Sequence, residues 1–282
     1  MKLFQEKLDN HHAQVLTVDS VVHQARTAFQ DVLIFENRLF GRVLVLDDVI
    51  QLTERDNHIY HEMIAHVPLM AHGKAKRVLI VGGGDGGTLR EVLKHGVDEV
   101  VLVEIDAGVV ELAKEFFPQV SAGAFGDRRA NVVIGDGVEY VARAVESSFD
   151  VVIIDSTDPE GPGEQLFTQD FYDNCWRLLR RRGILVLQSG IGFHQPRRLQ
   201  AVCGRVASSF EAVSPFLVPV PTYAAGMLAL VAAGEHGGAL RPPVDTLAER
   251  WHPLRSELRY YTPEVHWSAF TMPPLFLPRL DE

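Results

Sequence analysis

The strongest indication of fold in this 282-residue chain is the segment Val78-Leu79-Ile80-Val81-Gly82-Gly83-Gly84-Asp85-Gly86-Gly87. Its four consecutive aliphatic residues predict a buried strand, and its glycines predict a tight turn that leads into a helix over residues 88–95. Because the turn carries almost no side chains, a nucleotide can approach the backbone at the N-terminus of the helix. The glycine spacing also satisfies the dinucleotide-binding pattern, but this pattern alone does not separate one class of nucleotide site from another.

The alternation of apolar strands and amphipathic helices continues after this segment and predicts a parallel sheet with crossover helices. We expect further strands at residues 99–104, 132–134, 151–155 and 184–188, and later antiparallel strands near 213–218 and 227–232. We expect the other main helices at residues 109–117, 137–146, 169–181 and 197–210.

Before this segment the pattern is different. Residues 12–52 alternate short apolar and β-branched runs with turn signals, which predicts a small antiparallel β meander. An apolar helical stripe then predicts a linking helix that Pro68 kinks or splits. We therefore predict an α/β protein with an N-terminal β domain at 1–55, a linking helix at 56–73 and a Rossmann-like, doubly wound domain at 74–282.

The bulk composition is that of an ordinary globular protein, with 46% hydrophobic and 23% charged residues. A formal net charge of −10 argues against nucleic-acid binding and favours a cationic small molecule near the surface. Residues 1–7 lack the apolar core of a signal peptide, and no apolar run reaches the ~18 residues of a membrane helix, so we expect a cytoplasmic protein without a membrane partner. The two cysteines, Cys175 and Cys203, belong to no paired thiol motif, and we expect core thiols.

Glu104 ends the second predicted strand and follows Gly82 by 22 positions. At this place in such folds a carboxylate accepts hydrogen bonds from a ribose diol, which indicates an adenosine-type ligand. The alternative is a solvated acid at a strand end. We expect the nearby Asp106 to cap the following helix instead.

Asp85 lies inside the glycine loop, and its charge indicates which nucleotide-type ligand the loop can bind. Its carboxylate would repel the carboxylate of a methionine moiety and the phosphates of a dinucleotide, but it would attract an amine. The tail of decarboxylated S-adenosylmethionine has this charge without the competing acid. The alternative is an exposed turn aspartate.

The predicted strand at 151–155 delivers Asp155 and Asp158 to its carboxyl end, where open parallel sheets place ligand crevices. An alkyl ammonium has a pKa near ~10.4, so a site that uses its nitrogen as a nucleophile must first remove a proton. One carboxylate can accept that proton while the other holds the distal ammonium. The loop at 155–164 is long enough to act as a lid, although Asp155 and Asp158 can also be read as a strand cap and a turn.

Several motifs together resemble the spermidine synthase family over nearly the whole chain. These are Leu46-Asp47-Asp48-Val49-Ile50-Gln51, Thr53-Glu54-Arg55-Asp56, Tyr60-His61-Glu62-Met63, the loop at 82–87, the run at 155–164 and Pro221-Thr222-Tyr223. The resemblance implies a small N-terminal antiparallel β domain before a methyltransferase-type α/β domain. It also implies an aminopropyltransferase in which an amine attacks the carbon next to a sulfonium and methylthioadenosine leaves.

The resemblance assigns roles by position. It implies that Asp155 accepts the proton and that Tyr60 lies near the attacking nitrogen, with Asp158, Tyr223, His61 and Asp85 along the polyamine or aminopropyl chain. Around the methylthioadenosine portion it implies Gln30, Gln51, Glu104, Asp136, Gly137 and Pro162, with Gln188 as a weaker candidate. The co-substrate is decarboxylated S-adenosylmethionine, and no metal or prosthetic group is required.

Three positions depart from the family pattern. Asp48 stands where a turn glycine is common and can adopt the left-handed conformation of that turn. Glu160 stands where an apolar residue is common, and His61 where many members carry glutamine, so both bear on which amine is preferred. His58, His61 and Glu62 lie close on the linking helix, but their order is not that of the helical zinc motifs, and we expect no metal.

The amine acceptor stays open, because one methylene changes binding by only ~1–3 kcal/mol. We expect putrescine, with cadaverine, agmatine and spermidine as alternatives. The competing functions are a methyltransferase that uses intact S-adenosylmethionine, a nicotinamide enzyme and a non-catalytic sensor of polyamines or nucleosides. The resemblance implies a homodimer or homotetramer.

Overall fold

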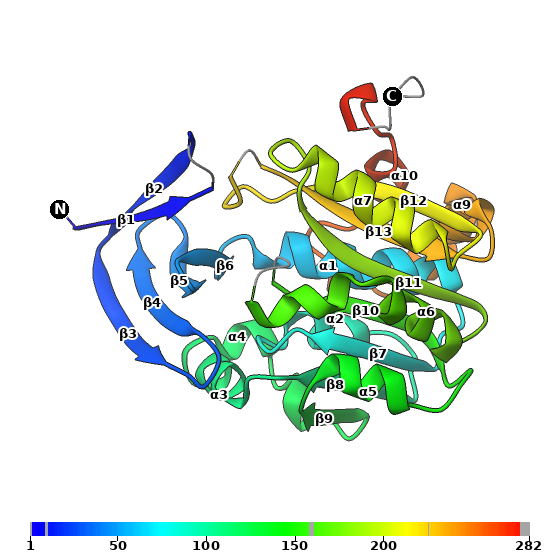
Figure 1. Cartoon of the computed structure of the whole chain (residues 1–282), viewed down its shortest axis with the longest axis horizontal. Helices are drawn as coiled ribbons and strands as arrows, with labels where there is room; N and C mark the ends of the chain where they lie inside the picture. Colours follow the sequence, from blue (N-terminus) through cyan, green and yellow to red (C-terminus); the bar gives the residue numbers. More distant parts are fainter. Residues whose placement is uncertain (1, 9–10, 158–160, 225, 277–282) are drawn as a thin grey trace.

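The protein is described by a computed structural model over residues 2–8, 11–157, 161–224 and 226–276 (Figure 1). It is an α/β structure in which antiparallel N-terminal strands stand beside a seven-stranded sheet that is covered by helices on both faces. This confirms the predicted fold class. Asp158 and Glu160 lie outside the described residues.

The N-terminal strands form two antiparallel sheets. Strands β1 (Lys2–Lys7) and β2 (Ala13–Val18) make a hairpin, and β3 (Ser20–Arg26), β4 (Asp31–Asn37), β5 (Gly41–Leu46) and β6 (Val49–Thr53) make a four-stranded meander. The turn between β5 and β6 places Asp47 and Asp48 at φ 45° and 63°, so Asp48 adopts the expected left-handed conformation. The predicted meander began at residue 12 and therefore omitted β1.

Helix α1 (Asn57–His72) links the two parts as one continuous helix that contains Pro68. The prediction that Pro68 splits it was wrong. Nearly the whole second half of the helix is buried, and it packs on α2 and on the central strands of the large sheet. This packing outweighs the one backbone hydrogen bond that a proline removes.

The large sheet has the order β12-β13-β11-β10-β7-β8-β9. Its parallel strands are β7 (Arg77–Gly82), β8 (Glu99–Glu104), β9 (Ala130–Ile134), β10 (Phe149–Asp155) and β11 (Leu179–Ile191), while β12 (Ala212–Pro219) and β13 (Met227–Gly234) pair antiparallel at one edge. The chain proceeds from β7 to β9 in one direction and then crosses to β10 on the other side of β7. The crevice between the carboxyl ends of β7 and β10 is therefore the topological switch point, where such sheets bind ligands.

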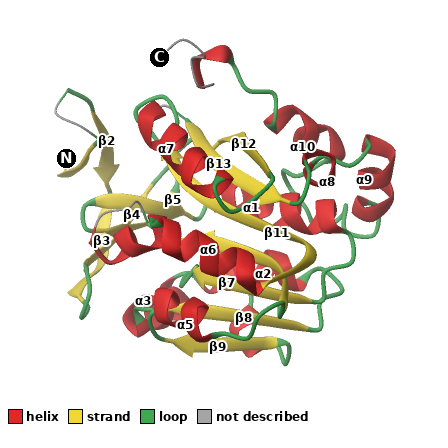
Figure 2. Cartoon of the chain, turned by 45° about the vertical axis from the view of Figure 1, so that its right-hand side comes forward, coloured by secondary structure: helices red, strands yellow, loops and turns green. Residues whose placement is uncertain are grey.

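Helices cover both faces of the sheet (Figure 2). Alternate residues of β7 point to opposite faces, since Val78 and Ile80 pack with α1 and α2 (Gly87–Leu93), whereas Leu79 and Val81 pack with the other layer. That layer contains α5 (Gly137–Arg143), α6 (Gln169–Leu178) and α7 (Pro196–Ala207). The remaining helices are α3 (Ala107–Phe116), α4 (Pro118–Ser121), α8 (Gly237–Leu240), α9 (Val244–Trp251) and α10 (Pro263–Ala269), with short 3-10 turns η1 (Ala124–Gly126), η2 (Gly161–Phe167) and η3 (Pro274–Phe276).

The largest difference between a predicted and an observed boundary within the α/β part lies between α6 and β11. The helix expected at 169–181 ends as α6 at Leu178, and β11 begins at Leu179, which pairs with Phe149. A register shift follows this pair, and Arg182 adopts φ 65°. The arginines after Leu179 have the polarity of an exposed helical face, which concealed the start of the strand.

Two other observations bear on function. In the part of the chain that the structure describes, no helix is both long enough and apolar enough to span a membrane. Cys175 is a buried free thiol, as predicted, whereas Cys203 is a half-buried free thiol that packs against the edge of the core.

Candidate active site

A cavity of about 410 Å³ lies at the carboxyl ends of β7, β8, β10 and β11, with the N-terminal strands on its other side. It brings together most of the residues that the sequence singled out: Gln30, Gln51, Tyr60, His61, Asp85, Glu104, Asp136, Gly137, Asp155, Gln188 and Tyr223. Asp158 lies outside the described residues, and Pro162 belongs to η2, where its side chain is not described. The roles of these residues stay predictions.

The glycine loop allows β7 and β10 to approach each other closely. Gly82 adopts φ 84°, and a Cβ atom at this position would lie 2.1 Å from the backbone oxygen of Asp155. The next amide, that of Gly83, donates to the same oxygen at 2.8 Å. Only glycine fits at position 82, and the contact fixes the loop against the strand that carries Asp155.

Glu104 is held by the backbone at the floor of the cavity. Its Oε2 accepts from the amide of Gly84 at 3.1 Å, and its Oε1 accepts from the amide of Asp106 at 2.9 Å. Burial, together with the Asp106 carboxylate, raises the pKa of Glu104 to about 7, although both amides act in the opposite direction. Near neutral pH this carboxyl group therefore exists in both protonation states. A ligand that donates a hydrogen bond to it stabilises the ionised state.

Asp106 fastens the N-terminal sheet to α3. Its Oδ1 accepts from the amide of Gly108 at 2.9 Å, which confirms the predicted helix cap. Its Oδ2 accepts from Thr27 Oγ1 at 2.6 Å and from Gln30 Nε2 at 2.9 Å. Gln30 therefore lines the cavity with its amide already bound to Asp106.

Asp136 and Gly137 lie at the start of α5. Asp136 is exposed, and its Oδ1 caps the helix by accepting from the amides of Val138 at 2.7 Å and Glu139 at 3.3 Å. Any ligand contact of this carboxylate then falls to Oδ2. A Cβ atom at Gly137 would lie 2.4 Å from Val81 Cγ1, so the glycine allows the helix to start against β7.

Asp155 accepts two short hydrogen bonds at the end of β10. Tyr60 donates its hydroxyl to Oδ1 at 2.6 Å, and Thr88 donates to Oδ2 at 2.6 Å. Burial and the nearby Asp85 carboxylate raise the pKa of Asp155, against the influence of His61 and of both hydroxyl donors. Burial and Asp155 raise the pKa of Tyr60 well above its usual value, so Tyr60 stays a neutral donor.

Asp85, which is half-buried, and His61, which is buried, form a pair beside Asp155. His61 Nε2 lies 3.3 Å from Asp85 Oδ1, and this oxygen also accepts from the amide of Gly87 at 2.6 Å. Burial alone lowers the pKa of His61, but the Asp85 carboxylate outweighs it and raises that pKa above its usual value. Burial likewise acts to raise the pKa of Asp85, yet His61 and the Gly87 amide keep it low. His61 thus partly neutralises the negative charge of Asp85 in the cavity.

Tyr223 reaches the cavity from the loop between β12 and β13. Its hydroxyl donates to the backbone oxygen of Gln51 at 2.5 Å. The preceding residue, Thr222, donates its amide to Asp56 Oδ2 at 2.8 Å, while Thr53 donates its hydroxyl to Asp56 Oδ1 at 2.6 Å. Asp56 therefore ties the loop that carries Tyr223 to the N-terminal sheet.

Sequence reasoning missed Glu6 and Thr88. Glu6 lines the cavity from β1 with only 4% of its surface exposed, and its Oε1 accepts from the amide of Ile50 at 3.0 Å. In β1 the buried positions are Phe4 and Glu6, so the inward alternation was a signal for this acid once the strand was recognised. Thr88 gave only a weak signal, a polar residue in the first turn of a buried helix.

No cluster of three or more histidine, cysteine or acidic side chains able to hold a metal ion occurs among the described residues.

Known proteins resemble this chain over almost its full length. A family model for the spermine/spermidine synthase domain matches residues 57–241, and one for the spermidine synthase tetramerisation domain matches residues 3–54. Polyamine aminopropyltransferase 1 of Pseudomonas aeruginosa is 46% identical over 98% of this chain and 97% of its own. The polyamine aminopropyltransferase of a Ruegeria species is 48% identical over 95% of this chain and 94% of its own.

Solved structures show the same likeness. A spermidine synthase in complex with the transition-state analogue AdoDATO superimposes with a TM-score of 0.91 at 37% identity, covering 96% of this chain and 92% of its own. The spermidine synthase of Thermotoga maritima gives a TM-score of 0.88 at 36% identity over 96% of this chain and 91% of its own.

Proposed function

We propose that this chain, which belongs to the spermine/spermidine synthase family of aminopropyltransferases, transfers the aminopropyl group of decarboxylated S-adenosylmethionine to putrescine. The products are spermidine and methylthioadenosine. The observation that carries the proposal is one cavity that joins a nucleoside-type carboxylate, Glu104, to the acidic groups Asp155 and Asp85. The solved relative that binds a transition-state analogue shares this fold and supports a transfer reaction.

Asp155 is the proposed proton acceptor. Putrescine enters as a dication, and the attacking nitrogen must lose a proton before its lone pair is free. Burial and Asp85 raise the pKa of Asp155, which brings it closer to that of the ammonium and makes the carboxylate a better base. Tyr60 and Thr88 each donate to one oxygen of Asp155, and a carboxylate oxygen has a second lone pair for the incoming proton.

The substitution step then balances without a metal. The nitrogen lone pair forms a bond to the aminopropyl carbon, the carbon–sulfur bond breaks, and its electron pair neutralises the sulfonium. The leaving group is the neutral thioether methylthioadenosine. The proton that Asp155 accepted passes to solvent after the products leave.

The two ends of the substrates meet different residues. We assign the ribose diol to Glu104 and the adenine edge to Asp136 and Gly137. We assign the polyamine side to Asp158, Tyr223, Asp85 and His61, and we add Glu6 as a buried carboxylate at the N-terminal wall. Gln30, Gln51, Pro162 and Gln188 complete the proposed binding residues.

Intact S-adenosylmethionine fits this site less well. Its methionine carboxylate would face Asp85 and Asp155, and a desolvated pair of like charges is costly. His61 reduces the charge of Asp85 but does not reverse it, because Asp85 keeps a low pKa and stays ionised. A decarboxylated tail presents only an ammonium group to these acids.

The proposal includes assembly into a homodimer or homotetramer. The support is the tetramerisation family model over residues 3–54, together with exposed apolar side chains on the N-terminal strands. We propose no prosthetic group and no nucleic-acid partner.

The test is a panel reaction. Purified protein is incubated with decarboxylated S-adenosylmethionine and, separately, putrescine, cadaverine, agmatine or spermidine, and the products are measured by mass spectrometry. The proposal predicts equimolar methylthioadenosine and spermidine, with the highest kcat/KM for putrescine. A higher kcat/KM for another amine would correct the acceptor, and methyl transfer from intact S-adenosylmethionine without aminopropyl transfer would overturn the proposal.

A further inference from the structure

We infer that Thr88 is a positioning residue for the transfer reaction, acting through Asp155. Its hydroxyl keeps the proton acceptor ionised and fixes the direction of its carboxylate. The inference rests on the proposed function, because it assumes that Asp155 deprotonates the amine.

A short hydrogen bond from a buried side chain supports this role. Thr88 Oγ1 donates to Asp155 Oδ2 at 2.6 Å, and Thr88 has 0% of its surface exposed. The other oxygen of Asp155 accepts from Tyr60 at 2.6 Å. Two donors on opposite oxygens prevent the carboxylate from rotating about its Cβ–Cγ bond, so the lone pairs that remain face fixed directions.

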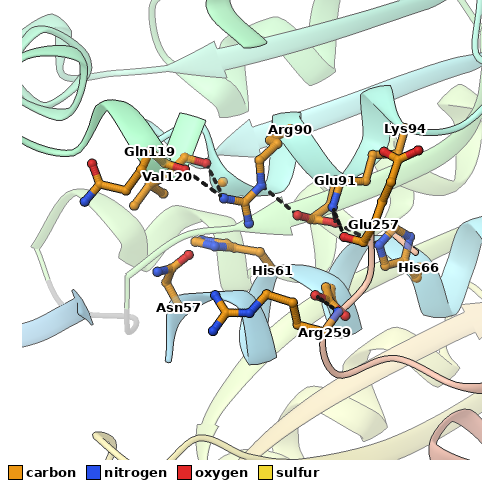
Figure 3. Close-up of polar contacts among 12 residues, drawn as sticks. Asn57, His61, His66, Arg90, Glu91, Lys94, Gln119, Val120, Glu257 and Arg259 are labelled. Carbon is orange, nitrogen blue, oxygen red and sulfur yellow. Dashed lines mark hydrogen bonds and ion pairs between the residues drawn. The ribbon is translucent and has the colours of Figure 1, made fainter. Parts of the chain in front are cut away.

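The helix that carries Thr88 is itself held rigidly. One turn further along α2, the buried carboxylate of Glu91 binds His66 Nε2 of α1 at 2.9 Å, and it also binds Arg90 and Lys94, each at 2.7 Å (Figure 3). Arg90 continues to the backbone oxygen of Val120 at 2.7 Å. This network locks α2 to α1, the helix that supplies Tyr60, so both donors to Asp155 rest on one rigid support.

The surroundings make Asp155 sensitive to the loss of a donor. Among the described residues, the titratable groups that face it are Tyr60 and His61 of α1, Asp85 of the glycine loop, Glu104 of β8 and Tyr223 of the β12–β13 loop. Of these, Asp85 opposes ionisation and Glu104 does so when charged, while His61 favours it. Thr88 contributes a hydrogen bond without charge, so its removal changes the protonation of Asp155 without taking a charged side chain out of the site.

The experiment compares Thr88→Ser with Thr88→Ala, because these variants differ by a single oxygen atom. The pH profile of kcat/KM for putrescine is measured for both at saturating decarboxylated S-adenosylmethionine. Activity requires ionised Asp155, so loss of a donor raises the pKa of Asp155 and moves the acid limb to higher pH. We expect the alanine variant to shift that limb by about one pH unit relative to the serine variant. Its activity then recovers at alkaline pH.

A second measurement does not depend on turnover. The carboxyl carbon of Asp155 is titrated by NMR in protein labelled at aspartate, with Asp155→Asn used to assign the signal. The pKa of Asp155 is expected to be higher in Thr88→Ala than in Thr88→Ser. Thr88→Val, which keeps the shape of threonine, replaces the alanine variant if the latter does not fold.

Equal acid limbs and equal Asp155 titrations in the serine and alanine variants would overturn the inference, even if both lost activity, because Thr88 would then only fill space. Absence of methylthioadenosine from the unmodified enzyme with every amine would instead overturn the proposed function. The NMR titration would still decide the effect of Thr88 on Asp155 in that case.

Discussion

The ribose contact that we propose for Glu104 links the protonation of this residue to ligand binding. Its pKa of about 7 in the free protein means that it is partly protonated at neutral pH, since burial disfavours its charge. A ribose diol donates to the carboxylate and favours the ionised form. We therefore predict that the affinity for methylthioadenosine is highest above pH 7 and falls, by up to about tenfold per pH unit, as the pH drops below that pKa.

Isothermal titration calorimetry at several pH values tests this prediction, with buffers of different ionisation enthalpy to count the protons released on binding. Glu104→Gln is the matched control, because it preserves the shape of the side chain and cannot titrate. This variant is expected to bind more weakly and without the pH dependence. An affinity of the unmodified enzyme that does not change across neutral pH would refute the assignment of Glu104 to the ribose.

The site residues differ in how far the sequence could predict them. Asp85, Glu104 and Asp155 follow directly from strand ends and the glycine loop, because parallel strands bring their carboxyl ends together. Glu6 and Thr88 depend on contacts between positions far apart in the chain, such as Glu6 with Ile50 and Thr88 with Asp155. A pattern of single residues carries no signal for such pairs.

Among the elements, the turn at the end of β7 restricts its sequence most strongly. Gly82 has a left-handed φ of 84°, and a side chain there would meet the backbone oxygen of Asp155 at 2.1 Å. We predict that Gly82→Ala lowers the free energy of unfolding by at least ~2 kcal/mol and abolishes transfer, because the end of β10 must move. Chemical denaturation and the rate of methylthioadenosine formation measure the two effects.

Gly96 provides the control for that substitution. A Cβ atom at Gly96 would have no heavy atom within 4 Å apart from those of Gly96 itself and its two chain neighbours. Gly96→Ala is expected to change stability by no more than about 0.5 kcal/mol and to leave the rate intact. If both alanine variants behaved alike, the close approach of the loop to β10 would not be the constraint that we describe.

The secondary structure followed the sequence where local patterns and packing agree. The strands of the large sheet and the main helices lie where they were predicted, because their apolar residues face a core on one or both sides. The predictions failed where tertiary contacts override local preference. Pro68 sits inside a helix that is buried around its circumference, and Leu179 joins a strand because it pairs with Phe149.

At the scale of the whole molecule, the N-terminal strands present apolar side chains outward. Leu3, Val15 and Val21 are 55%, 54% and 39% exposed. We predict an oligomer that forms through this surface, so that Leu3→Glu combined with Val15→Glu reduces the molar mass toward that of the 31.4 kDa monomer. Size-exclusion chromatography with light scattering gives the mass directly.

Val145→Glu is the control for this substitution pair. Val145 is 77% exposed and belongs to the α/β part of the chain that follows the N-terminal strands. It is expected to leave the mass unchanged. A monomeric unmodified protein at micromolar concentration would rule out assembly through the N-terminal strands.

For the whole enzyme, we propose that the reaction depends on Asp155 taking the proton from the attacking amine. Asp155→Asn keeps the size of the side chain, and its amide oxygen can still accept from Tyr60 or Thr88, but an amide is not a useful base. The most direct measurement is the single-turnover rate of methylthioadenosine formation from bound decarboxylated S-adenosylmethionine after mixing with putrescine. We predict a fall of about 10²–10⁴-fold in Asp155→Asn, with little change in the affinity for methylthioadenosine. A rate that stays within a few-fold of the unmodified enzyme would show that Asp155 is not the proton acceptor.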